Sequence, residues 1–334
     1  MNKTFSFIIP VYNGAGVVEH ALDSIYSQGL SLEDFEVICV DDCSPTLDTY
    51  NALNNYVYHD VHPNNLHIIR HTVNKRQGGA RNTALLHAKG EWILYLDQDD
   101  YFLGHSLLAL LDEVKSYHFC SILMFDYMLK VIGRRERREI YAGSYYTEVF
   151  KGVEFIKRFP IPWTPWCYAY RRDFLLSNKI QFEENVRFED VDYVIKCTLL
   201  ADRMVFVPLE VYCHIDSGEN TSVVGNDIER ISDLFKISVR IRNVSLNFMS
   251  INKAAALTAM GHHVFHYHSL LLSYLWRLSY DEIVEILIKY PPYENSNDHL
   301  VIFVSKFPRI YAMTAQIMRP ILLSLLWIRK RMRR

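Results

Sequence analysis

Three carboxylates fall within four residues of this chain, in the run Asp97-Gln98-Asp99-Asp100. The run follows residues 91–96, whose apolar side chains predict a buried strand. Clustered carboxylates repel one another and are costly to desolvate, so a compensating cation is expected. Mg²⁺ and Mn²⁺ prefer oxygen ligands and commonly join protein carboxylates to phosphate oxygens. The run therefore predicts a divalent metal site, with a solvated acidic turn as the simpler alternative.

A second acidic segment, the pair Glu189-Asp190, lies at the start of a predicted helix that continues to Leu199. A carboxylate in the first turn of a helix can simply complement the helix dipole. In a substrate site it can instead accept a proton from an attacking hydroxyl group. Position alone favours the dipole interpretation, so a catalytic role for Asp190 needs support from other parts of the sequence.

The elements that must position these residues alternate along the first hundred residues. Apolar runs of strand length alternate with segments of helical periodicity. The predicted strands and helices cover 5–11, 17–26, 35–40, 66–70, 79–88 and 91–96. This order predicts an α/β fold with a mainly parallel sheet flanked by helices and built from βαβ units.

Polar clusters follow three of these predicted strands, at Tyr12-Asn13, at Asp41-Asp42 and at Asp97–Asp100. In open α/β sheets, ligands bind in the crevice beyond the carboxyl ends of the strands. We therefore expect the three clusters to meet in one site. The aspartate pair could equally be a turn or a helix N-cap, and Asn13 an ordinary turn residue.

Further elements are predicted beyond Asp100: a helix over 107–114, a strand over 121–131, a basic turn over 134–138 and a short strand over 204–207 that ends at Pro208. From about Asn226 only helical periodicity remains. We therefore expect an α/β domain over 1–222 and a helical appendage over 223–334.

Composition limits the classes of partner and compartment. Half of the residues are hydrophobic and 22% are charged, as in globular proteins. The formal charge is −2, but residues 319–334 hold six basic residues and no acidic one, which leaves −8 elsewhere. An acidic body argues against nucleic acid as a partner. Six scattered cysteines and the lack of a leader pattern predict a reducing, cytoplasmic location.

Residues 310–334 combine an apolar stretch with a basic end. Arg319-Pro320 lies in the middle of the stretch, which argues against a transmembrane span. An interfacial helix attracted to the anionic inner face of the plasma membrane fits better. A buried helix with a solvated basic end is the alternative.

A series of motifs in this sequence resembles, in the same order, those of family 2 glycosyltransferases, over roughly residues 5–215. The matching segments are Phe7–Asn13, Ala21–Gln28, Val40–Ser44, Asn74–Asn82, Leu96–Asp100 and Glu189-Asp190. The family usually has Gly two residues after the asparagine of the fourth motif, where this chain has Arg76. At this position the loop departs from the family's pattern.

The resemblance implies a GT-A fold and inverting transfer of a sugar from a nucleotide sugar, by family habit a UDP-sugar. By position, Pro10, Tyr12, Asn13 and Asp42 would line the nucleotide pocket, with Asp97 near the ribose. Asp99 would bind Mn²⁺ or Mg²⁺ on the diphosphate. Asp190 would be the catalytic base, with Glu189 in support.

Other residues carry two interpretations each. Arg81, beside Lys75 and Arg76 near the start of a predicted helix, could contact phosphate or lie in a solvated basic loop. His214 could be a further metal or diphosphate ligand, or a structural residue. The aromatic residues Trp163, Trp166 and Tyr168 could form an acceptor platform or belong to the core.

The sequence predicts a metal-dependent glycosyltransferase that acts on a glycan or lipid-linked acceptor in surface-polysaccharide synthesis. A nucleotidyltransferase is disfavoured because the turn after the first strand, residues 10–14, contains no Lys or Arg. A nucleotide-sugar-binding or assembly subunit without turnover remains as a rival, because a fold is not a function.

Overall fold

The computed structural model describes residues 3–58, 63–132, 137–139, 148–159, 161–216, 227–292 and 298–319. The chain divides into two compact units, Met1–Asn220 and Thr221–Arg334. The boundary expected between residues 222 and 223 lies outside the described residues and stays a prediction.

The first unit is built on one mixed sheet, which has nine strands in the described part of the chain. Eight of them follow the order β3-β2-β1-β4-β8-β6-β9-β5, and β7 pairs with β6. β1, β2, β3 and β4 are parallel to one another, and β8 is antiparallel to both β4 and β6. The strand bounds are β1 Phe5–Val11, β2 Phe35–Asp41, β3 Leu66–Arg70, β4 Trp92–Tyr95, β5 Tyr101–Phe102, β6 Ile122–Val131, β7 Arg137–Glu139, β8 Tyr168–Arg171 and β9 Met204–Asp216.

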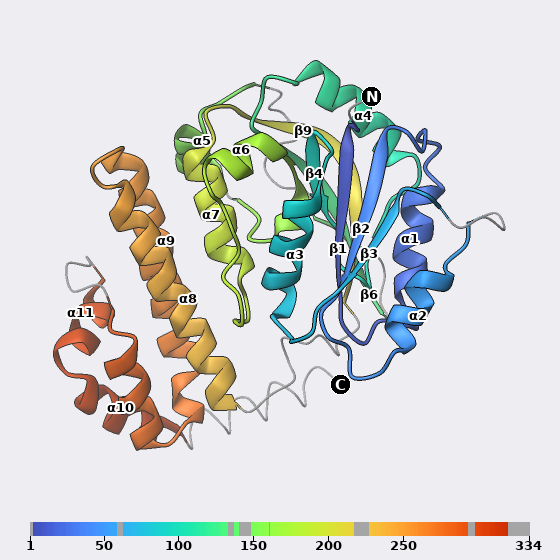
Figure 1. Ribbon diagram of the computed structural model, residues 1–334. Coiled ribbons are helices and arrows are strands. Elements are labelled where there is room, and N and C mark those ends of the chain that lie inside the picture. The colour runs from blue at the N-terminus through green and yellow to red at the C-terminus, as the bar shows by residue number, and fades with distance from the viewer. Residues whose placement is uncertain are drawn as a thin grey trace. The chain divides into compact units, whose positions relative to one another are not determined.

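Helices cover both faces of this sheet. β1, β2 and β3 follow one another in one direction, whereas β4 returns to the other side of β1. Because crossovers between parallel strands are right-handed, α1 and α2 lie on one face and α3 on the other, as Figure 1 shows. The helix bounds in this unit are α1 Val18–Tyr26, α2 Asp48–Asn55, α3 Arg76–His87, α4 Ser106–Ser116, α5 Gly152–Arg158, α6 Arg172–Ser177 and α7 Asp190–Leu200, with the short 3₁₀ helix η1 at Pro165–Cys167.

The change of direction creates a topological switch point between β1 and β4. Both strands are buried along their whole length, which is why they read as continuous apolar runs. Loops that leave neighbouring strands at a switch point diverge to opposite faces and open a crevice between them. The Asp97–Asp100 run therefore stands beside the loop that follows β1.

The four parallel strands and the predicted helices of the first hundred residues are confirmed to within a few residues, whereas α2 was not predicted. The predicted helix over 107–114 and strand over 121–131 correspond to α4 and β6. The predicted basic turn over 134–138 falls mostly outside the described residues. The antiparallel strand β8 and the short elements around it were missed because they lack a clear period.

The predicted end of a short strand at Pro208 is wrong. β9 continues to Asp216, and its pairing with β6 shifts register where Val207 pairs with Phe125 and Glu210 with Asp126. A β-bulge of this kind accommodates a proline, which cannot donate a ladder hydrogen bond. The longer strand carries Tyr212 and His214, and Cys213 between them pairs with Tyr101 of β5.

The second unit is helical throughout its described residues, as expected. It contains α8 Asp227–Phe248, α9 Lys253–Ser273, the 3₁₀ helix η2 Leu275–Arg277, α10 Tyr280–Lys289 and α11 His299–Lys306, and residues 308–319 are also helical. One apolar core joins these helices around Phe235, Tyr267 and Leu275. Among the described helices, none is long and apolar enough to cross a membrane.

Gly90, at the entry to β4, provides a test of the packing between β1 and β4. A Cβ at this position would lie 2.4 Å from the carbonyl carbon of Phe5 and 2.5 Å from the amide nitrogen of Ser6. We expect Gly90→Ala to lower the free energy of unfolding by about 2 kcal/mol or more, measured by urea denaturation.

The matched control is Gly104→Ala, because a Cβ at Gly104 has no neighbour within 4 Å among the atoms of the structure. Its free energy of unfolding should change by less than about 0.5 kcal/mol. Equal effects of the two substitutions would show that the contact between Gly90 and β1 does not constrain the fold.

Candidate active site

The loops after β1 and β4 are joined across the switch point by one side chain. The Gln98 Oε1 accepts from the Tyr12 backbone N–H at 2.9 Å, and the Gln98 Nε2 donates to the Tyr12 carbonyl at 3.2 Å. A Cβ at Gly14 would lie 2.4 Å from the Gln98 Oε1, so this approach requires glycine. The loop after β2 joins the same assembly, because the Asn13 N–H donates to the Ser44 Oγ at 2.9 Å.

Asp41, the last residue of β2, and Asp42, directly after it, have different roles. Asp41 is a turn residue, whose Oδ1 accepts from both the backbone N–H and the hydroxyl of Ser44. The buried Asp42 connects two further loops: its Oδ1 contacts the His71 Nδ1 at 2.7 Å and accepts from the Lys75 N–H at 2.9 Å. Its Oδ2 has no hydrogen bond to another residue in the described part of the chain. Asp42 is thus held rigidly with one oxygen available.

Arg81, on α3, is the centre of the site. Its Nη1 donates to the Glu189 Oε1 at 2.9 Å and to the Asp190 Oδ1 at 2.7 Å, and its Nη2 donates to the Asp97 Oδ1 at 2.7 Å. The ring of Phe182 also lies under the guanidinium, with its centroid 5.1 Å from the Cζ. One cation therefore ties the acidic run after β4 to the acidic pair at the start of α7.

Direct contact between Arg81 and the nucleotide sugar, one of the roles expected from the sequence, does not fit this geometry. The residue has no exposed surface, and three carboxylates occupy the outer atoms of its guanidinium. A phosphate would have to displace at least one of these ion pairs. In this structure Arg81 holds the three acidic residues in place, and its contact with phosphate stays a prediction.

The acidic pair at the start of α7 is held in a constrained conformation. Phe188, immediately before it, has φ of 58°, which is unfavourable for a large side chain. A Cβ at Gly78 would lie 2.6 Å from the carbonyl oxygen of Glu183 and 3.1 Å from the Cγ of Glu189. The glycine therefore allows α3 to approach closely the segment that leads into Glu189 and Asp190.

Asp100 and the long strand β9 form the other side of the site. The buried Asp100 accepts from the Tyr212 hydroxyl at 2.6 Å and contacts the His214 Nδ1 at 3.0 Å through the same Oδ2. The Tyr212 hydroxyl also accepts from the Asp97 N–H at 3.1 Å. Trp166 stacks on the Tyr212 ring at 4.3 Å and on the His214 ring at 5.4 Å. His214 is therefore oriented by a carboxylate and an indole.

Asp99 differs from its neighbours because it is exposed and makes no hydrogen bond or ion pair to another residue in the described ranges. The surrounding loop desolvates its carboxyl group, and Asp97 and Asp100 repel a further negative charge. Together they raise the pKa of Asp99 to about 6. Asp100, Asp97 and Asp99 raise the pKa of His214 against the opposing effect of burial. The loop thus carries an excess of negative charge.

The surroundings of the acidic pair Glu189-Asp190 also carry an excess of negative charge. Three carboxylates surround one guanidinium, so two negative charges are uncompensated. Burial and the Glu189 carboxylate raise the pKa of Asp190 well above its usual range, and Asp97 adds to this, although Arg81 opposes the shift. A carboxylate with a raised pKa is a stronger base, as proton abstraction requires.

The three aromatic residues considered as an acceptor platform do not form one exposed surface. Trp166 and Tyr168 are buried, and the Tyr168 hydroxyl donates to the Pro162 carbonyl at 2.9 Å. These two residues belong to the core that supports β9, which was the alternative interpretation. Of the three residues, Trp163 is the one that is only partly buried and has solvent-accessible surface.

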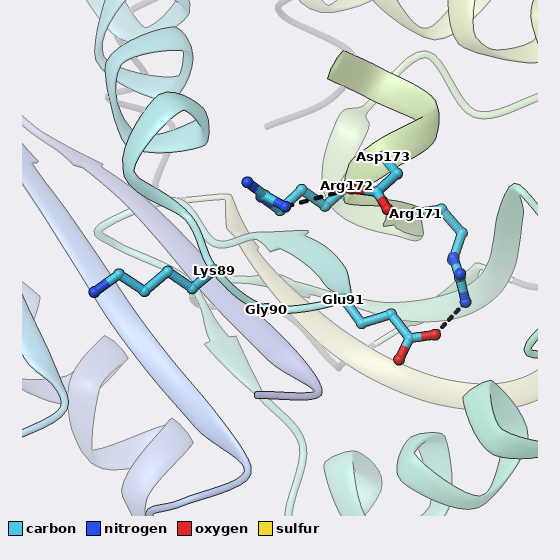
Figure 2. Close-up of a pocket in the computed structure, with 6 residues that line it drawn as sticks. All are labelled: Lys89, Gly90, Glu91, Arg171, Arg172 and Asp173. Carbon is cyan, nitrogen blue, oxygen red and sulfur yellow. Dashed lines mark hydrogen bonds and ion pairs between the residues drawn. The ribbon is translucent and has the colours of Figure 1, made fainter. Parts of the chain in front are cut away.

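A pocket of about 300 Å³ lies away from this site. Figure 2 shows its lining, in which Arg171 reaches Glu91 and Arg172 reaches Asp173. Glu91 directly precedes β4. Arg171, on the antiparallel strand β8, pairs with Trp92, the first residue of β4. The pocket is therefore at the edge of the sheet opposite the acidic residues, and its own ion pairs neutralise most of its charge.

Three residues that support the site were not predicted from the sequence: His71, Gln98 and Tyr212. His71 directly follows β3, so the rule that drew attention to the other strand ends could have found it. Tyr212 lies two residues from His214, on the same side of a strand, but the predicted strand ended too early to show this. Nothing in the local sequence marks Gln98 as a bridge.

The raised pKa of Asp190 predicts how stability depends on pH. A carboxyl group whose pKa is higher in the folded state contributes stability at low pH and loses it as pH rises through the folded pKa. Asn cannot ionise, so Asp190→Asn should match the wild type in acid and become more stable than it at higher pH, by about 1 kcal/mol or more. Thermal denaturation across pH measures this difference.

The exposed Asp173 supplies the control: Asp173→Asn should change the free energy of unfolding by less than about 1 kcal/mol, because exposed ion pairs contribute little to stability. A wild type whose advantage over Asp190→Asn grows with pH would show that the ion pair with Arg81 dominates and that the pKa of Asp190 is low.

Comparison with known proteins agrees with this geometry. The model of glycosyl transferase family 2 matches residues 6–182. The chain is 43% identical over 104 residues to a poly(ribitol-phosphate) beta-glucosyltransferase of Bacillus spizizenii, covering 31% of this chain and 16% of that protein. It is 29% identical over 252 residues to the poly(ribitol-phosphate) beta-N-acetylglucosaminyltransferase TarS of Staphylococcus aureus, covering 72% and 41%. The chain spans less than half the length of these two relatives.

A crystal structure of a Staphylococcus aureus TarS fragment in complex with UDP-GlcNAc matches the fold. The TM-score is 0.67 at 21% identity, over 95% of this chain and 89% of the fragment. The likeness confirms the GT-A fold with a helical region after it. The family model covers more than half of the sequence, and the chain belongs to glycosyl transferase family 2.

Proposed function

We propose that this chain is an inverting glycosyltransferase that moves a sugar from a nucleotide-diphosphate sugar to a hydroxyl group of its acceptor. The observation that carries the proposal is the Arg81 cluster, which holds Asp97 and Asp190 within reach of one guanidinium. The proposed metal-binding run, through Asp97, and the proposed base, Asp190, would meet there beside the switch point of an α/β sheet. Donor activation and proton abstraction need this combination.

The nucleotide would bind between the loops after β1 and β2. Tyr12 and Asn13 are exposed at the end of β1, and Pro10 lies opposite Val40 in the register of β1 and β2. The Oδ2 of Asp42 would accept from an N–H of the base, because His71 and Lys75 already hold the Oδ1. The Oδ2 of Asp97 would face the ribose, since its Oδ1 is engaged by Arg81.

The donor set fits a divalent metal with few protein ligands. No group of three or more His, Cys, Asp or Glu side chains within the described residues could hold a metal by itself. Mg²⁺ and Mn²⁺ commonly take one or two protein ligands and complete their coordination with phosphate oxygens and water. Asp99 would supply a carboxylate and His214 its Nε2. The contact of the His214 Nδ1 with Asp100 would orient the ring, as a carboxylate commonly orients a metal-binding histidine. When bound, the metal would neutralise charge on the leaving diphosphate.

Asp190 would act as the base in a single displacement. The acceptor hydroxyl gives its proton to the Asp190 carboxylate while its oxygen bonds to the anomeric carbon. The bond from that carbon to the diphosphate oxygen breaks, and the nucleoside diphosphate leaves. The transferred sugar then has the inverted configuration at its anomeric carbon. Glu189 contacts the same Nη1 of Arg81 as Asp190, so it helps to fix the base and to raise its pKa.

The relatives suggest the classes of donor and acceptor. TarS is a beta-N-acetylglucosaminyltransferase of poly(ribitol-phosphate), and a fragment of it has been crystallised with UDP-GlcNAc. We therefore propose a UDP-sugar as donor and a glycan or lipid-linked acceptor of a surface polysaccharide. Peripheral contact of residues 310–334 with an anionic membrane would bring the site to a lipid-linked acceptor, and it stays a separate proposal.

The direct test is release of nucleoside diphosphate from UDP-, GDP- and dTDP-sugars with Mn²⁺ or Mg²⁺ and a lipid-linked acceptor extract. Asp190→Asn should reduce turnover by at least about a hundredfold, because the proton has no acceptor. Asp99→Ala should weaken the binding of Mn²⁺ in the presence of UDP, measured by calorimetry. Asp173→Asn, at the opposite edge of the sheet, should behave as the wild type.

Metal-dependent donor binding without turnover on any acceptor would instead identify a nucleotide-sugar-binding subunit. Full turnover by Asp190→Asn would reject the assignment of the base while leaving the donor site intact.

A further inference from the structure

The helix over residues 308–319 is fixed to the second unit by a face of small and polar residues. Ala312 has no exposed surface and Ala315 is 7% exposed, and both belong to the apolar core of that unit. The Tyr311 hydroxyl donates to the Leu271 carbonyl at 2.6 Å, and the Gln316 side chain donates to the Leu278 carbonyl. Two buried residues and two hydrogen bonds determine which side of this helix faces inward.

The opposite side of the helix carries its large apolar residues. Ile310, Met313 and Ile317 are 51%, 56% and 71% exposed, and Met318 beside them is 40% exposed. The spacing i, i+3, i+7 places the first three on one face, which we call the outer face together with Met318. A helix of a soluble protein normally buries its large apolar residues. Here small residues are buried and large ones are exposed, which indicates a partner for the outer face.

The stretch of sequence that contains the outer face is basic. Residues 299–334 contain eight Lys and Arg residues and no Asp or Glu, so the remainder of the chain carries −10. Two of these cations, Lys306 and Arg309, are exposed next to the outer face in the sequence. An apolar helix face bordered by basic residues is the pattern of a helix that lies in the interface of a bilayer containing anionic lipid.

We propose that the outer face docks on an anionic lipid bilayer, with the helix in the plane of the surface. The charge argues against a second copy of the chain as the occupant. In a symmetric dimer the same patch meets itself, so basic residues of both copies would lie together. A bilayer containing phosphatidylglycerol offers hydrocarbon to the isoleucines and negative headgroups to the basic residues. The proposal does not rest on transferase activity.

Flotation of the full-length protein with vesicles tests the proposal. The protein should float with vesicles that contain phosphatidylglycerol, remain behind with pure phosphatidylcholine, and be released by high salt. Ile317→Glu should weaken binding by about tenfold or more, because it removes an inserted apolar side chain and adds a repelled charge.

The matched control is Ile288→Glu on α10, where the isoleucine is 63% exposed but lies outside the outer face. It should leave vesicle binding within about twofold of the wild type. Both isoleucines are exposed, so neither substitution should prevent folding, which circular dichroism verifies.

Three results would overturn the proposal. Equal binding to neutral and anionic vesicles would exclude the charge as a determinant. Equal losses in Ile317→Glu and Ile288→Glu would show that the outer face is not the contact. A dimer in light scattering that Ile317→Glu dissociates, without flotation of the wild type, would identify a second copy as the occupant.

Discussion

The site depends on the burial of one guanidinium among three carboxylates. A buried Arg81 without partners would be strongly unfavourable, and so would Asp97, Glu189 and Asp190 without the cation. Each side therefore requires the other, and the interaction joins segments more than one hundred residues apart in the sequence. Burial of Asp190 and the neighbouring carboxylates of Glu189 and Asp97 raise its pKa, against the opposing effect of Arg81. Structure and proton affinity thus come from the same cluster.

The sheet topology supplies the frame for this cluster. The reversal from β1 to β4 brings the loops after both strands together, and Gln98 joins them through the backbone of Tyr12. On the other side, the bulge near Pro208 lets β9 continue far enough to place Tyr212 and His214 against Asp100. The Asp97–Asp100 loop is therefore held from both sides, while Asp99 is left without a protein partner in the described residues. A loop held in this way can present a carboxylate to a metal with little reorganisation.

How much of this the sequence could predict depends on the range of the interactions. Buried parallel strands and their polar ends are local patterns, so β1 to β4 and the acidic runs were readable. Arg81 was noticed as a cation near a helix start, but its partners lie 16 and more than one hundred residues away, so its ion pairs could not be predicted from the local sequence. The extension of β9 was missed because a proline normally ends a strand, and only pairing with β6 shows the bulge.

We propose that Arg81 acts in turnover through Asp190. A double-mutant cycle of Arg81→Lys and Asp190→Asn tests it most directly, with turnover measured at saturating donor on variants that circular dichroism shows to be folded. If Arg81 positions the base, the double variant should lose no more than Asp190→Asn alone, within about threefold, because residues that act as a unit are not additive. If the fold-loss in turnover of the double variant is instead the product of the two single losses, Arg81 serves the reaction independently of Asp190.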